Sequence, residues 1–145
     1  MSIDARPDAA AFKQQTRAEW DDAAAGWDRH GPAIRAWLRM PTDAMLEMVG
    51  LRSGQTVLDV AAGAGDQTLD ISARVGPTGA VVATDISAGI LSFALGNAVR
   101  AGHDNVTIHP ADAEDLRLEN ATFDAAVCRL GLMFLPDPLA GLREV

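Results

Sequence analysis

A short apolar segment that leads into a glycine-containing turn constrains the fold of this chain more than any other feature. Residues 57–72 read VLDVAAGAGDQTLDIS. The apolar, β-branched run at residues 56–60 is typical of a strand buried on both faces of a sheet. Gly63 and Gly65 follow it, and apolar residues at helical spacing then continue to residue 75. The pattern predicts a strand, a tight turn and a helix over residues 65–75.

The turn between this strand and this helix has the properties of a ligand site. Small side chains at residues 61–65 let the backbone approach a ligand closely and adopt conformations that larger residues avoid. A helix that begins at Gly65 points its free amides and the positive end of its dipole at the same ligand. Glycines in such a turn also occur for packing alone, and that alternative stays open at this point.

Strands and helices continue to alternate along the chain. Strands are predicted at residues 80–84, 106–108 and 123–128, and a helix capped by Ser87 is predicted to extend to about residue 101. Asp137 and Pro138 have the residue types of an N-cap and a first helical position, so another helix begins there. Helical crossovers between strands imply a parallel sheet. The predicted fold class is therefore α/β, with a doubly wound parallel sheet.

The first 50 residues differ from the others because they contain no strand-like run. Two helices are predicted at residues 9–28 and 42–49, with Gly31 and Pro32 as a break between them. We therefore expect an N-terminal helical cap at residues 1–50, followed by the sheet-forming unit at residues 51–145.

Charge and composition disfavour several classes of function. The net charge is −8, so no basic cluster is available to bind nucleic-acid phosphates. The single cysteine, Cys128, excludes an internal disulfide framework and a cysteine-based zinc site, and no metal is predicted. The N-terminal residues lack the apolar core of a signal peptide, and no segment is predicted to span a membrane. A cytoplasmic protein is expected.

The residues of the turn distinguish between nucleotide cofactors. A dinucleotide-binding fingerprint needs glycine or alanine three positions after its second glycine, and Thr68 stands there after Gly65. Asp59, at the end of the strand, would repel a pyrophosphate and attract a cationic ligand. S-adenosylmethionine has no phosphate and carries an ammonium and a sulfonium, so the charges favour it over a nicotinamide dinucleotide.

Four segments of the chain follow a shared pattern. Residues 59–65 read DVAAGAG, residues 82–87 read VATDIS, residues 110–116 read PADAEDL, and the fourth segment extends from residue 123 to residue 138. In this order they resemble the class I S-adenosylmethionine-dependent methyltransferases, in particular the small-molecule branch that contains ubiquinone and menaquinone biosynthesis methyltransferases. The first segment matches the D-x-G-x-G-x-G motif of that family, with Ala61 in place of the first glycine.

The resemblance implies a Rossmann-like methyltransferase fold, of which residues 51–145 form the cofactor-binding half. The family's sheet has seven strands, and the resemblance reaches the fourth, so the fold is expected to be incomplete at its C-terminal side. We therefore expect this stretch of chain to bind the cofactor weakly, without turnover. The cofactor-binding residues that the resemblance implies are Asp59, Ala61, Gly63, Gly65, Asp85, Ile86, Asp112, Ala113 and Arg129.

Individual roles follow from the same resemblance. Asp85, at the end of the second strand, is expected to accept the ribose hydroxyls, as acidic residues do at this place in nucleotide-binding sheets. Ile86 is expected to pack on the adenine face, while Asp112 and the backbone amide of Ala113 meet its amino group and a ring nitrogen. Arg129 is expected to hold the methionine carboxylate through two parallel hydrogen bonds, with an exposed arginine at a strand end as the alternative.

The implied reaction is an in-line transfer of the sulfonium methyl group to a small-molecule acceptor. A general base is needed only where the acceptor loses a proton, and the candidates are His30 and His109, so no catalytic residue is assigned. Trp20 and Trp27 lie seven positions apart, on one face of the first helix. That face either packs on the sheet or, as the resemblance implies, forms a lid over the cofactor.

Two other functions stay open. The chain is alternatively a noncatalytic module that forms a homodimer through its exposed fourth strand, because uncovered edge strands pair readily. It is alternatively an NAD-dependent oxidoreductase, a hypothesis that Thr68 and Asp59 weaken.

Overall fold

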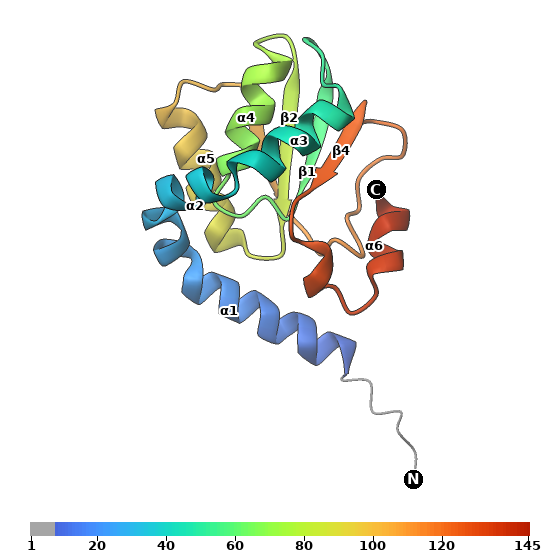
Figure 1. Cartoon of the computed structure of the whole chain (residues 1–145). Coiled ribbons are helices and arrows are strands. Elements are labelled where there is room, and N and C mark those ends of the chain that lie inside the picture. Colours follow the sequence, from blue (N-terminus) through green and yellow to red (C-terminus); the bar gives the residue numbers. More distant parts are fainter. Residues whose placement is uncertain (1–7) are drawn as a thin grey trace.

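Four parallel strands lie side by side at the centre of the structure (Figure 1). The computed structural model describes residues 8–145. Its strands are β1 (Thr56–Val60), β2 (Ala80–Asp85), β3 (Val106–Pro110) and β4 (Ala125–Cys128), in the order β3-β2-β1-β4. β1 pairs in parallel with both β2 and β4. The carboxyl ends of the strands therefore meet at one edge, and the predicted α/β fold is confirmed.

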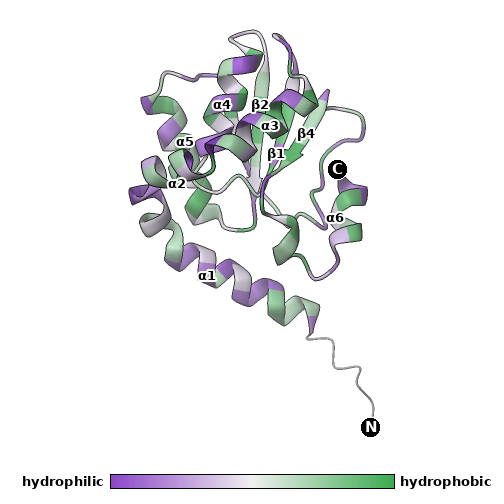
Figure 2. Cartoon of the chain, viewed as in Figure 1, coloured by the Kyte–Doolittle hydropathy of each residue, from purple (hydrophilic) through white to green (hydrophobic). Residues whose placement is uncertain are grey.

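Helices α3 (Arg39–Val49), α4 (Asp66–Val75) and α5 (Ala88–Arg100) cover one face of the sheet. The buried core on this face consists of Leu46, Val57, Ile71, Val75, Val81, Ala98, Val106 and Val127. On the opposite face, Leu58 and Val60 of β1 pack against Leu116, in the segment between β3 and β4. Figure 2 shows the strands as largely hydrophobic, as expected for a sheet buried on both faces.

The described residues before residue 51 contain three helices, one more than the sequence predicts, and the division into a cap and a sheet-forming unit stays a prediction. They are α1 (Ala9–Arg29), α2 (Gly31–Trp37) and α3. The break predicted at Gly31 and Pro32 lies one residue earlier and is shorter than predicted. The chain turns at His30, and Gly31 and Pro32 already belong to α2. Proline is tolerated in a first helical turn, where its missing N–H has no helical partner to lose. The first seven residues of the predicted cap, including the start of the segment judged against signal peptides, lie outside the described residues.

Several predicted helix ends are confirmed by their side-chain caps. Ser87 accepts a hydrogen bond from the amide of Ile90 at the start of α5. Asp137 accepts hydrogen bonds from the amides of Leu139 and Ala140 at the start of α6 (Pro138–Glu144). A 3₁₀ turn, η1 (Leu132–Phe134), lies between β4 and α6 and was not predicted.

β4 lies at one edge of the sheet, where β1 is its only partner in the part of the chain that the structure describes. The edge position agrees with the sequence-based expectation, while the homodimer through this edge stays a prediction. None of the described helices is both long enough and apolar enough to span a membrane.

Gly65 is the point where α4 comes closest to α5. Its backbone is left-handed, with φ of +87°, and a β-carbon at this position would lie 2.8 Å from Cβ and 2.9 Å from Cα of Ala94. Glycine is therefore needed twice, for the conformation of the turn and for the approach of the two helices. The packing alternative raised for the glycines of this turn applies to Gly65.

We expect Gly65→Ala to destabilise the fold by roughly 3 kcal/mol, because the strain of a left-handed alanine adds to overpacking in the core. Gly102→Ala is the matched control. Gly102 also has a positive φ, of +77°, but a β-carbon on it would meet no atom within 4 Å. Its replacement is expected to cost roughly 1 kcal/mol. Urea denaturation of both variants measures this difference. Equal losses of unfolding free energy would show that the close approach of α4 and α5 adds nothing to the cost of a side chain at Gly65.

Candidate cofactor site

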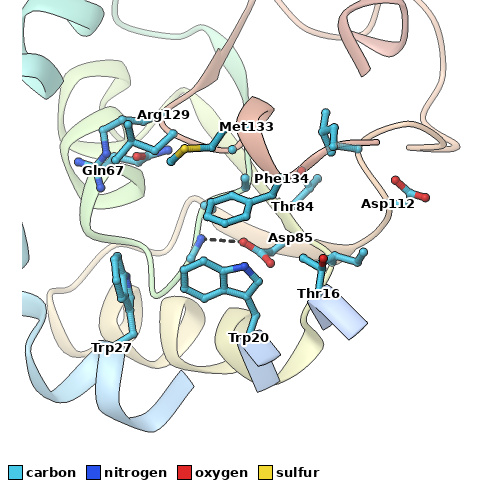
Figure 3. Close-up of a pocket in the computed structure, with 18 of the residues that line it drawn as sticks. Thr16, Trp20, Trp27, Gln67, Thr84, Asp85, Asp112, Arg129, Met133 and Phe134 are labelled. Carbon is cyan, nitrogen blue, oxygen red and sulfur yellow. Dashed lines mark hydrogen bonds between the residues drawn. The ribbon is translucent and has the colours of Figure 1, made fainter. Parts of the chain in front are cut away.

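A cavity of about 420 Å³ lies where the carboxyl ends of the strands face α1 (Figure 3). The turn after β1, the ends of β2 and β3, and the segment after β4 form its other walls. α1 contributes Lys13, Thr16, Trp20 and Trp27, whose spacing places them on one helix face. The strand order reverses between β1 and β4, so the cavity occupies the place where open parallel sheets bind ligands.

Asp85 presents the carboxylate that lines this cavity at the end of β2. Its Oδ2 accepts a hydrogen bond from the amide of Gly63, 3.0 Å away, and its Oδ1 accepts one from the amide of Ser87 at 3.1 Å. Burial raises the pKa of Asp85 above its ordinary value, and the backbone hydrogen bonds oppose this shift. Each oxygen retains a lone pair, so the carboxylate is oriented by the backbone and still able to accept hydrogen bonds from a ligand.

Asp59 does not face the cavity, which corrects the prediction that its charge selects the ligand. Its side chain is fully buried, and it accepts hydrogen bonds from Gln67 Nε2 at 2.5 Å and from Thr68 Oγ1 at 2.6 Å. Burial raises the pKa of Asp59 to about 7, although both hydrogen bonds favour the carboxylate. Asp59 therefore holds the start of α4 against the end of β1, and its side chain does not line the cavity.

Arg129 lines the cavity, but its guanidinium is already engaged. Nη2 donates to both oxygens of Asp66, at 2.9 and 2.8 Å, and Nη1 donates to Thr42 Oγ1 at 2.6 Å. In this arrangement the guanidinium does not have two parallel N–H groups free, so the expected pair of hydrogen bonds to a ligand carboxylate stays a prediction that would require Asp66 to move. Nε is buried and has no partner within the described residues. The Nε–H group is therefore available to a ligand, as is the second hydrogen of Nη1.

Lys13 is a cavity residue that the sequence analysis did not identify. Its ammonium lies 2.7 Å from Asp112 Oδ2 and 2.5 Å from Glu114 Oε2. The predicted adenine-binding carboxylate is therefore bound to α1 in this structure. The spacing of Lys13 from Trp20 and Trp27, which places all three on one helix face, is the signal that would have found it.

Aromatic side chains close the cavity between α1 and η1. Trp20 makes edge-to-face contacts with Trp27, at 5.4 Å between ring centroids, and with Phe134, at 5.5 Å. Both geometries are favourable for aromatic pairs. Figure 3 shows the side chains of Trp20 and Phe134 beside Asp85, an arrangement that is compatible with the lid interpretation of α1. The same helix also packs on α5, where Ala24 and Ile90 are buried together, so the two interpretations are compatible.

The remaining predicted residues divide into two groups. Ala61, Gly63, Ile86 and Ala113 line the cavity. Gly65 lies behind it, against α5, and the two candidate bases are elsewhere: His109 bonds to the carbonyl of Leu116, and His30 joins α1 to α2.

The chemistry of these groups fits S-adenosylmethionine. The unpartnered N–H of Arg129 suits a carboxylate, and the oriented carboxylate of Asp85 suits ribose hydroxyls. The aromatic and apolar walls suit the adenine ring. A phosphate would meet Asp85 beside Gly63, so the negative charge of the site still disfavours dinucleotides, now through Asp85 rather than Asp59.

We expect Asp59→Asn to flatten the pH dependence of stability. Since the pKa of Asp59 is about 7 in the folded state and near 3.8 in the unfolded state, the folded chain binds the extra proton between these values. Stability from this group is present below the unfolded pKa and is lost as the pH rises toward the folded pKa. Urea denaturation should show the wild type losing on the order of 3 kcal/mol more than the variant from about pH 4 to about pH 8. The same dependence of stability on pH in both proteins would contradict the raised pKa of Asp59.

Comparisons with known proteins identify the family of the chain. A model of the ubiE/COQ5 methyltransferase family matches residues 35–145. The demethylmenaquinone methyltransferase of Staphylococcus aureus (strain JH9) is 32% identical over 143 residues, covering 95% of this chain and 57% of the relative. The chain thus spans little more than half the length of the curated relatives that it matches.

Solved structures show the same fold. A SAM-dependent methyltransferase from Aquifex aeolicus is 30% identical, with a TM-score of 0.66 over 71% of this chain and 55% of its own. A putative S-adenosyl-L-methionine-dependent methyltransferase from Methanococcus maripaludis has a TM-score of 0.74 over 86% of this chain and 56% of its own. Its identity of 21% supports the fold alone. The family match argues against the oxidoreductase alternative and implies S-adenosyl-L-methionine as the cofactor. The chain belongs to the ubiE/COQ5 family of methyltransferases.

Proposed function

We propose that this chain forms the cofactor-binding part of a methyltransferase that acts on a small apolar molecule by in-line methyl transfer. The observation that carries the proposal is the Asp85 carboxylate, which the amides of Gly63 and Ser87 orient into a cavity at the strand ends. This arrangement combines a carboxylate that can accept hydrogen bonds with a close approach of the backbone, in a site whose cations, Lys13 and Arg129, are already paired with carboxylates.

The chain's own residues would hold S-adenosylmethionine in defined ways. Asp85 would accept hydrogen bonds from the ribose hydroxyls, and Ile86 and Ala113 would contact the adenine ring. Asp112 would accept a hydrogen bond from the adenine amino group while it keeps its ion pair with Lys13. Arg129 would donate one hydrogen bond, from Nε, to the methionine carboxylate. When bound, the cofactor supplies an activated methyl group that an acceptor atom can take by in-line displacement.

The acceptor would lie against the apolar wall between α2 and η1. The wall consists of Trp37, Leu38, Leu130, Met133, Phe134, Leu135 and Pro136. Such a surface would position an apolar ring and exclude water, which are the main contributions that a protein makes when the methyl donor is already activated. The curated relatives are named for demethylmenaquinone, and an apolar quinone-type acceptor agrees with this wall.

No side chain of the described cavity has the position and chemistry of a dedicated general base, because Asp85, Asp66 and Asp112 are each engaged as described above. The proposal therefore assigns the chain positioning and not proton transfer. A cytoplasmic location and a homodimer through β4 stay predictions.

We expect Asp85→Asn to weaken binding of S-adenosylhomocysteine by roughly tenfold to a hundredfold, since hydrogen bonds to a charged acceptor contribute about 1.5–3 kcal/mol. Isothermal titration calorimetry on the full chain measures the change in Kd. Asp104→Asn is the control, because Asp104 is exposed and does not line the cavity. Equal affinities for wild type and Asp85→Asn would remove the central support of the proposal.

The acceptor class is tested by tryptophan fluorescence, because all three tryptophans of the chain line the cavity. With S-adenosylhomocysteine present, a reduced naphthoquinone is expected to quench the emission saturably, while the more polar catechol leaves it unchanged. Stronger quenching by catechol would contradict an apolar acceptor. Replacing S-adenosylhomocysteine with S-adenosylmethionine and measuring product formation checks the expectation of binding without turnover in the same samples.

A further inference from the structure

Two neighbouring cavity residues have the reverse of the residue types that their backbones favour. Ala61, directly after β1, has φ of 55°, a left-handed conformation in which glycine is the least strained residue. Gly131, at the start of η1, has φ of −80° and ψ of −35°, which every residue adopts easily. The alanine is thus placed where the backbone favours glycine, and the glycine is placed where the backbone does not need it.

Space explains why residue 131 is glycine. A β-carbon on Gly131 would lie 2.4 Å from Cβ of Ala61 and 2.8 Å from Sγ of Cys128. Both distances are too short for any real contact, and neither neighbour can move aside as the end of a flexible chain. The methyl group of Ala61 therefore occupies the volume that a side chain at residue 131 would need.

The contact lies at the junction of two strands. Val60 and Cys128, the last residues of β1 and β4, are in register, so the segments that follow them leave the sheet side by side. The second segment then passes through Leu130, whose φ of 64° is also left-handed, and enters η1. η1 carries Phe134, which meets Trp20 across the cavity. The position of this wall thus depends on how closely residue 131 approaches residue 61.

We propose that Ala61 and Gly131 are a size-matched pair that positions the Leu130–Phe134 segment as a wall of the cofactor cavity. The two residues act as positioning residues, and the strain of the left-handed alanine is retained because its methyl group fixes the start of η1. The effect on ligand affinity rests on the cofactor-binding function proposed above. The effect on the ligand-free fold does not.

The test is a double-mutant cycle of Ala61→Gly, Gly131→Ala and the combined variant, read by thermal unfolding without ligand and by calorimetric titration with S-adenosylhomocysteine. Gly131→Ala is expected to lower the unfolding midpoint by about 5 °C and the affinity by about tenfold. Ala61→Gly is expected to raise the midpoint by about 2 °C, because strain is released, and to weaken binding by about threefold, because the wall loosens. The combined variant is expected to recover the part of both losses that the clash with Ala61 causes, while the contact with Sγ of Cys128 remains.

The opposite signs for Ala61→Gly separate positioning from a purely structural role, which would move stability and affinity together. Gly26→Ala is the control, because a β-carbon on Gly26 would meet no atom within 4 Å and the residue lies inside α1. Additive midpoint shifts in the ligand-free chain would overturn the pairing, whether or not the chain binds the cofactor. If the wild type binds S-adenosylhomocysteine but the two substitutions change its affinity additively, the positioning role is wrong while the structural pairing still holds. Absence of binding by the wild type would instead count against the proposed function.

Discussion

The buried carboxylate of Asp59 fixes the connection on which the cavity depends. It accepts hydrogen bonds from Gln67 and Thr68, so the first turn of α4 is tied to the end of β1. The chain must then change direction within the few residues of the turn between β1 and α4. In this turn the amide of Gly63 donates a hydrogen bond to Asp85 at the end of the neighbouring strand. A fully satisfied polar network of this kind specifies one arrangement of the elements that it joins. The position of the Gly63 turn, which lines the cavity, is therefore set by a residue that does not itself line it.

The charges around the cavity are paired unequally. Asp66 and Arg129 compensate each other, while Lys13 faces both Asp112 and Glu114, so one negative charge remains in that group. Asp85 is different, because only backbone amides bind it. A cavity that contains a backbone-oriented carboxylate and this remaining negative charge favours ligands that bring hydroxyls or positive charge. The acidic character inferred from the motif is therefore real, although a different aspartate supplies it.

Local signals in the sequence predicted the fold well. The strand of residues 56–60, the cap at Ser87 and the cap at Asp137 depend on residues within a few positions, and the structure confirms them. The partners of Arg129 could not be predicted, because Asp66 and Thr42 are 63 and 87 positions away. No local sequence pattern indicates which distant side chains will accept hydrogen bonds from a guanidinium. α2 was missed for a different reason, since a proline can begin a helix as well as interrupt one.

The helices before residue 50 are part of the cofactor site as well as of the sheet's core. Leu46 of α3 is fully buried with Val57 and Ile71. Thr42, one helical turn earlier, bonds to the arginine that follows β4. The same helix thus buries apolar surface against the sheet and orients a cavity residue. A loss of packing in α3 would therefore displace Arg129, so stability and ligand binding are coupled through a helix that itself lines none of the cavity.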